Sequence, residues 1–177
     1  TEQEIDPTLP GVEGLEGQAA RLVCAVHRCN REVFSRSGRS ANQGGMGSTV
    51  VALLLDPPNR ELHIVHVGDS RCYRVRGGEI QLLTEDHSMI NEALRLNPDL
   101  SPEILAQLPS NVVTRALGTK EDVQPDVRSE PMRAGDVYIL CSDGLSGEVS
   151  DEDILLAVLQ SDELEEACEH LVGMANE

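Results

Sequence analysis

Two aspartates follow apolar runs and stand beside glycines, Asp69 in "VGDSR" (67–71) and Asp143 in "CSDGL" (141–145). Each motif alone predicts a turn, because Gly and Asp are typical turn residues. Together, the two strand-end aspartates could place two carboxylates on one edge of a sheet. Hard cations such as Mg²⁺ and Mn²⁺ prefer such oxygen ligands and keep waters in their remaining positions. The pair therefore indicates a divalent-metal site as the alternative to two turns.

Two arginines also have side chains that could do chemistry, in a chain with only 14 Lys and Arg against 31 Asp and Glu. Arg71 follows the first aspartate, and Arg115 lies in "NVVTRALG". A guanidinium can hold a phosphate or carboxylate through two parallel hydrogen bonds. For either arginine taken alone, a salt bridge with one of the many acids is the favoured interpretation.

Two other motifs suggest chemistry less strongly. The glycine-rich "GGMGST" (44–49) lacks the G-K-[ST] ending of a phosphate-binding loop and has no lysine nearby, so it predicts a flexible entry to a strand. His63 and His66 resemble a metal pair, but their spacing places them on opposite faces of a strand. We expect these two histidines to have packing or surface roles.

The elements that position these residues follow from the periodicity of apolar residues. A helix is expected from Leu15 onward, and the nearly continuous apolar run 48–56 predicts a strand covered on both faces. Residues 61–84 predict three strands, joined by tight turns at Gly68-Asp69 and at Gly77-Gly78.

The second half of the chain predicts mainly helices. Helical spacing returns in residues 88–108, and 135–142 predicts a strand. Ser150 is the expected cap of the next helix, and the last helix falls within 163–175. Separate runs of strands and helices predict an α+β fold rather than alternating βαβ units.

Composition limits the classes of function. The chain has 177 residues, enough for one domain with a hydrophobic core, and a formal net charge of −17. That charge argues against nucleic-acid and anionic-membrane partners, because no basic stripe could neutralise phosphates. The five cysteines are odd in number and scattered, which predicts neither a disulfide framework nor a zinc site and favours the cytoplasm. No apolar stretch is long enough to span a bilayer.

Four blocks, taken in order, resemble the protein phosphatase 2C family, the metal-dependent serine/threonine phosphatases, in its bacterial form. The blocks are "GMGSTVVALLL", "HVGDSRCYRVRGGEIQLLTEDHS", "NVVTRALG" and "GDVYILCSDGLSGEVSDEDI". The similarity runs from about Gly45 to Ile154. Each block alone is a modest signal, and their shared order and spacing make the resemblance specific.

The resemblance implies an antiparallel β-sandwich flanked by helices in α-β-β-α layers, formed by residues 1–177 as a single, partial domain. It also implies hydrolysis of phosphoserine and phosphothreonine on proteins by a water held between Mn²⁺ or Mg²⁺ ions, two or three in the complete protein. Phosphorylated proteins would be the partners, among them a Ser/Thr kinase or its targets. The substrate could also be a sigma-factor regulator, as for the related sporulation-type phosphatases.

The resemblance further assigns roles to individual residues. Asp143 matches a metal ligand, and Asp69 matches an aspartate beside the cluster that helps to hold a third, weaker metal. Gly144 would let the backbone approach the ion. Residues about 87–118 match a flap beside the active site. Supporting roles around the site fall to Thr49, Ser70, Arg71 and Arg115.

Several family motifs have no match in this chain. The family begins with an R-x-x-N-x-D-like strand and D-G-M-G-G-H, and it ends with G-G-x-D-N-x-T-V; Gln43 and Gly44 stand where the second motif needs an aspartate. We assign no catalytic residue within this chain. The favoured explanation is a chain incomplete at both ends, whose missing segments carry the other ligands. The alternative is a catalytically inactive module that binds a phosphoprotein or a regulatory partner.

Overall fold

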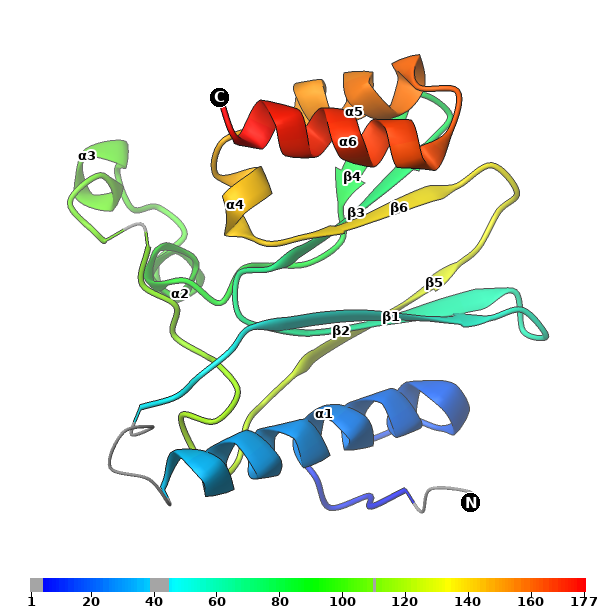
Figure 1. Ribbon diagram of the computed structural model, residues 1–177. Helices are drawn as coiled ribbons and strands as arrows, with labels where there is room; N and C mark the ends of the chain where they lie inside the picture. Colours follow the sequence, from blue (N-terminus) through cyan, green and yellow to red (C-terminus); the bar gives the residue numbers. More distant parts are fainter. Residues whose placement is uncertain (1–4, 39–44, 110) are drawn as a thin grey trace.

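Two antiparallel sheets lie one above the other, and helices cover their outer faces (Figure 1). The computed structural model describes residues 5–38, 45–109 and 111–177. The first sheet has the order β1-β2-β5, with β1 at Val50–Asp56, β2 at Glu61–Val67 and β5 at Asp126–Pro131. The second has the order β4-β3-β6, with β3 at Arg71–Arg76, β4 at Glu79–Leu82 and β6 at Val137–Cys141.

The helices complete a four-layer arrangement. Helix α1 covers the first sheet, α5 and α6 cover the second, and α2 and α3 lie at one side of the sandwich (Figure 1). Their bounds are α1 Gly17–Ser37, α2 Met89–Leu96, α3 Pro102–Leu105, α4 Asp143–Ser146, α5 Asp151–Gln160 and α6 Leu164–Ala175. The α-β-β-α layers confirm the α+β sandwich that the sequence and its resemblance predict.

The core is divided into three clusters that correspond to the three interfaces between layers. Leu62 and Ile64 on one face of β2 pack with Cys72 of β3 between the sheets. Val65 and Val67 of β2 pack against α1. The interface between the second sheet and its helices contains Tyr73, Ile154, Ala157 and Leu171. Strand β2 contributes to two of these interfaces, so it is the best-covered strand of the molecule.

The prediction that the first apolar run is covered on both faces is wrong. Strand β1 is the edge of its sheet, residues 50–54 are only half-buried, and Leu55 is 53% exposed. Residues 62–67 of β2 are all buried instead. A continuous apolar run indicates a strand, but it does not tell which neighbour lies in the middle of the sheet.

The turn expected at Gly68-Asp69 is not a hairpin. Strands β2 and β3 belong to different sheets, and residues 68–70 carry the chain from one sheet to the other. The second expected turn is confirmed: Gly77 and Gly78 have φ of 61° and 81° and join the antiparallel pair β3–β4. Residues 68–70 therefore lie at an end of the sandwich, where side chains from both sheets can meet.

Of the remaining elements, some agree with the predictions from the sequence and others were not predicted. The Ser150 hydroxyl caps α5 by accepting the Asp153 amide at 3.2 Å, as expected. The helical spacing of 88–108 forms two short helices, α2 and α3, rather than one. The sequence missed strand β5, whose "DVRSEP" has little apolar content, and the single helical turn α4 directly after β6.

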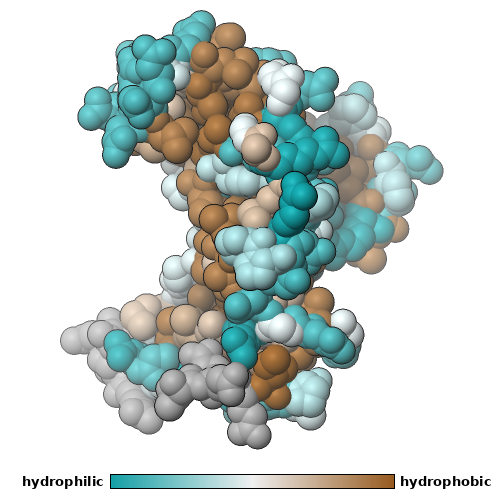
Figure 2. Space-filling view, turned by 90° about the vertical axis from the view of Figure 1, so that its right-hand side faces the viewer, coloured by the Kyte–Doolittle hydropathy of each residue, from teal (hydrophilic) through white to brown (hydrophobic). Residues whose placement is uncertain are grey.

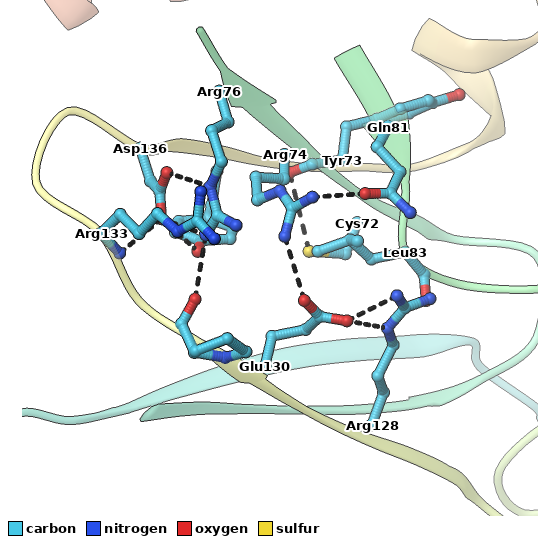
Figure 3. A network of polar contacts seen from close by, with 12 residues as sticks. Cys72, Tyr73, Arg74, Arg76, Gln81, Leu83, Arg128, Glu130, Arg133 and Asp136 are labelled. Carbon is cyan, nitrogen blue, oxygen red and sulfur yellow. Dashed lines mark hydrogen bonds and ion pairs between the residues drawn. The ribbon is translucent and has the colours of Figure 1, made fainter. Parts of the chain in front are cut away.

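A network of arginines and acids joins the two sheets near the connection between β5 and β6 (Figure 3). Arg74 of β3 binds Glu130 of β5 at 3.0 Å, although these strands lie in different sheets. Arg76 of β3 holds both oxygens of Asp136, each at 2.7 Å, and Asp136 lies in the segment that connects β5 to β6. These ion pairs fix the second crossing between the sheets.

The Arg76–Asp136 pair predicts a pH-dependent contribution to stability. The pKa of Asp136 lies well below its ordinary value of 3.8, chiefly because Arg76 hydrogen-bonds the carboxylate. A lowered pKa in the folded state stabilises the protein above the unfolded pKa, and the contribution is lost as pH falls toward the folded pKa. We expect Asp136→Asn to reduce the free energy of unfolding at pH 7, and the deficit to shrink progressively below about pH 4. Urea titrations at pH 7 and pH 3 measure it; an equal deficit at both values would contradict the assignment.

Large apolar side chains remain exposed on the helical layer over the second sheet (Figure 2). They include Leu156, Leu159, Leu164 and Val172, each 48–62% exposed.

No helix among residues 5–38, 45–109 and 111–177 is long and apolar enough to cross a membrane.

Candidate metal centre

Asp69 and Asp143 come to the same end of one pair of strands. In the antiparallel pair β3–β6, Arg71 stands opposite Cys141. Asp69 precedes Arg71 by two residues and Asp143 follows Cys141 by two, so both aspartates lie just beyond the same end of this strand pair. This placement supports the prediction of a metal site from the two sequence motifs.

The pKa of Asp69 reflects its partial burial and the charges of neighbouring side chains. Partial burial raises the pKa of Asp69 above its usual value, and the negative charges of Asp143 and Asp86 raise it further. The positive charge of Arg71 opposes this shift only in part. A divalent cation would relieve the repulsion among these carboxylates, so the donor set fits a hard metal ion.

Asp143 is presented by the start of α4. The strand β6 ends at Cys141, and Asp143 is the first residue of a single helical turn, where its carboxylate is exposed. The following residue, Gly144, is also exposed, and a β-carbon added there would meet only the Ser142 hydroxyl at 3.5 Å. Packing within the chain therefore does not require a glycine at 144, and the approach of an ion remains a proposed reason for it.

The segment carrying Asp69 is held closely against Thr49. Gly68 has φ of 112°, and a β-carbon there would lie 2.4 Å from Cγ2 of Thr49. The Thr49 hydroxyl in turn hydrogen-bonds the buried Ser70 hydroxyl at 2.9 Å. Thr49 thus contacts both chain neighbours of Asp69, Gly68 and Ser70. Gln43 and Gly44 lie outside the described residues.

Arg71 binds a third carboxylate, Asp86, that the sequence analysis did not single out. Its guanidinium contacts both Asp86 oxygens, Nε to Oδ1 at 3.0 Å and Nη2 to Oδ2 at 2.8 Å, and donates to the Tyr73 hydroxyl. These contacts, led by the one with Asp86, raise the pKa of Arg71. The salt bridge favoured for Arg71 alone is present, and Asp86 appears only because the loop after β4 folds back onto β3.

Arg115 is paired with a different acid, Asp126 at the start of β5, at 2.8 Å. It also donates to the backbone carbonyl of Gln124. Its favoured sequence interpretation, a salt bridge, is again what the structure contains. No described contact joins Arg115 to Asp69 or Asp143, so its supporting role around the metals would be indirect.

The sequence analysis missed a polar group formed by two buried histidines, His66 and His87, and the partly exposed Asp126. Ligand atoms of these three lie within 4.8 Å of one another, which resembles a metal site. The two imidazole rings, however, are stacked at 4.7 Å and 28°, so their in-plane lone pairs do not converge on one point.

The hydrogen bonds of the two rings also favour a structural role over metal binding. His66 donates from Nε2 to the Glu85 carbonyl at 2.8 Å, and burial lowers the pKa of this ring, which keeps it neutral. The Nδ1 atom of His87 accepts the Gly68 amide at 3.1 Å. We therefore regard the three residues as an internal polar network next to the Asp69 segment.

The structural class of this protein is an α-β-β-α sandwich with acidic residues just beyond the ends of two neighbouring strands. The family model for protein phosphatase 2C matches residues 16–177. The chain therefore belongs to the protein phosphatase 2C family.

Known relatives agree with this membership. The chain is 38% identical over 157 residues to the serine/threonine protein phosphatase PstP of Mycobacterium tuberculosis, and the match covers 88% of this chain and 30% of PstP. It is 34% identical to protein phosphatase PhpP of Streptococcus pneumoniae, covering 78% of this chain and 56% of PhpP. The solved catalytic domain of PstP with two manganese ions superposes with a TM-score of 0.76 at 35% identity, covering 92% of this chain and 67% of that one. The chain thus spans about a third to somewhat over half of these two curated relatives.

Proposed function

We propose that this chain is part of a metal-dependent protein phosphatase that hydrolyses phosphoserine and phosphothreonine. The observation that carries the proposal is the meeting of Asp69 and Asp143 at one end of β3 and β6, in a chain of the protein phosphatase 2C family. Bound Mn²⁺ or Mg²⁺ would lower the pKa of a coordinated water and offset charge on the phosphoryl oxygens. The manganese ions in the related PstP structure support this choice of cofactor.

Each residue of the site would have a separate task. Asp143, exposed at the start of α4, would supply a metal ligand, and Asp69 would stand beside the cluster and help to hold a third, weaker ion. Gly144 would leave room for the ion, since no side chain of the described residues occupies that space closely. Arg71 already binds Asp86 and the Tyr73 hydroxyl, so it would hold the acids in place and partly offset their charge rather than grip the substrate.

The substrates and the compartment form the finer part of the proposal. Phosphorylated proteins, among them a Ser/Thr kinase or its targets, would be the partners, as the names of the phosphatase relatives suggest. Residues 87–118, which carry α2 and α3 at the side of the sandwich, would act as the flap that affects substrate choice. The five cysteines are free thiols, and this supports a reducing cytoplasm.

The proposal makes a direct prediction for residues 1–177 by themselves. Hard-ion sites are built from several oxygen ligands, and of the proposed ligands this chain contributes only Asp143 and Asp69. We expect weak Mn²⁺ binding and no hydrolysis of a phosphothreonine peptide by this chain, with Mn²⁺-dependent hydrolysis by a longer protein that adds the remaining ligands. Phosphate release at increasing Mn²⁺ concentration measures both, and turnover by residues 1–177 alone would refute the proposed division of ligands.

The alternative function, a catalytically inactive binding module, lacks a specific observation in its favour. Asp69 and Asp143 are both present and interact electrostatically. A module that binds no metal would require neither of them. A longer protein that fails to hydrolyse phosphopeptides at any Mn²⁺ or Mg²⁺ concentration would favour the module.

A further inference from the structure

His87 contacts the Asp69 segment through both its backbone and its side chain. The His87 amide donates to the Gly68 carbonyl at 2.9 Å, and the Gly68 amide donates to Nδ1 of the His87 ring at 3.1 Å. Both backbone polar groups of Gly68 are therefore bonded to one residue. Gly68 and His87 are both buried, so neither hydrogen bond can be replaced by water without cost.

The ring of His87 can accept the Gly68 amide in one tautomer only. Because Nδ1 is the acceptor, the proton of the neutral ring is on Nε2. That atom lies 3.4 Å from Oδ2 of Asp126, within ion-pair distance, and forms no hydrogen bond with the described residues. Contacts with His87 and with Arg115 hold the pKa of Asp126 well below its ordinary value, so Asp126 stays ionised and favours the Nε2 proton.

The backbone around His87 keeps the ring in place. The Thr114 amide donates to the His87 carbonyl at 2.8 Å, and Ser88 pairs with Val113 in a short antiparallel bridge. Residues 112–115 therefore supply both this backbone support and Arg115, which binds Asp126. The contacts form a continuous chain from Arg115 through Asp126 and His87 to Gly68.

The residue after Gly68 is the one that needs support. Asp69 directly follows Gly68 in the segment that joins β2 to β3, so the Gly68 peptide sets where the Asp69 backbone begins. Gly68 has no side chain that could anchor the segment, and the Thr49 side chain lies close to the place that a β-carbon would take. The two hydrogen bonds to His87 restrain the Gly68 backbone directly.

We propose that His87 is a positioning residue that fixes the Gly68 peptide and thereby holds Asp69 in place for the metal centre. Its consequence for catalysis rests on the proposed phosphatase function, whereas the hydrogen bond itself does not. Outer residues that orient metal ligands typically change metal affinity or activity by about 10- to 100-fold when they are replaced.

Two amide substitutions separate positioning from simple packing. In His87→Asn the amide oxygen lies near the place of Nδ1 and can accept the Gly68 amide. In His87→Gln the longer side chain reaches toward Asp126 and leaves the Gly68 amide without its acceptor. We expect Gln to weaken Mn²⁺ half-saturation of the longer protein by about 10- to 100-fold, and Asn to stay near the wild type. If packing volume alone mattered, Gln would be the better tolerated of the two, and that order overturns the proposal.

A spectroscopic measurement on residues 1–177 tests the hydrogen bond independently of any activity. In uniformly ¹⁵N-labelled protein we expect a scalar coupling between the Gly68 amide nitrogen and Nδ1 of His87, and its loss in His87→Gln. A missing coupling in the folded wild type would overturn the proposal, even if the longer protein proves to be a phosphatase. A coupling that is present while the longer protein lacks activity would keep the positioning role and reject the proposed function instead.

Discussion

Replacing Asp143 by asparagine is expected to remove the Mn²⁺-dependent phosphatase activity of a longer protein that contains this chain. Asparagine keeps the size of the side chain but loses the negative charge that a hard cation requires. Because replacement of outer residues alone costs about 10- to 100-fold, loss of a direct ligand should lower kcat/KM or Mn²⁺ affinity by at least about 100-fold. Mn²⁺ titrations of phosphopeptide hydrolysis measure the change.

Asp151→Asn is a matched control for this substitution. Asp151 is also an exposed aspartate at the first position of a helix, directly after a serine. Both variants lose an interaction with a helix N-terminus, typically worth about 0.3–1 kcal/mol, although α4 is a single turn and α5 is longer. We expect Asp151→Asn to leave the Mn²⁺ dependence unchanged. Normal activity of Asp143→Asn would show that the alignment of "CSDGL" with the family's metal ligand is wrong.

Gly68→Ala is expected to cause the largest loss of stability of any single methyl addition considered for this site. The backbone at Gly68 has φ of 112°, which L-residues rarely adopt, and the new methyl group would lie 2.4–2.6 Å from the Thr49 side chain. Strained backbone and overpacking each cost about 1–3 kcal/mol, so the variant should lose at least about 2 kcal/mol. Urea denaturation of residues 1–177 gives the free energy of unfolding directly.

Gly78→Ala separates the two contributions. Gly78 also has a positive φ, of 81°, but no atom lies within 4 Å of the position that its β-carbon would take. This variant should lose only the unfolding free energy that the strained backbone costs, about 1–2 kcal/mol. Equal losses for Gly68→Ala and Gly78→Ala would mean that the segment relaxes away from Thr49, and that the close contact is not a constraint on Asp69.

The sequence predicts most elements here because their signals are local. Apolar runs, paired glycines and the Ser150 cap indicate strands, a hairpin and a helix start without knowledge of the rest of the chain. Position within the sheet is not local, so the run containing Leu55 was expected to be covered although β1 is an edge strand. Strand β5 was missed because its "DVRSEP" is polar: Arg128 and Glu130 serve the network between the sheets rather than an apolar face.

Some residues of the candidate site can likewise be found from local sequence motifs, and others cannot. Asp69 and Asp143 carry motifs that can be found in the sequence, and the register of β3 with β6 brings them together. Asp86 and His87 lie in "TEDHS", where nothing in the local pattern distinguishes a partner of Arg71 from an ordinary loop residue. Their roles depend on the loop after β4 folding back to Gly68, which only the tertiary structure shows.

The pairing of β3 with β6 also has a consequence for the order of folding. These strands are neighbours in the sheet, although α2, α3 and β5 all lie between them in the sequence. Contacts so distant along the chain form late, since a long loop must close before they contribute any stability. During synthesis Asp69 therefore leaves the ribosome well before Asp143, and the two cannot meet until β6 has been made. The growing chain therefore contains no carboxylate pair from these two motifs until β6 has been made.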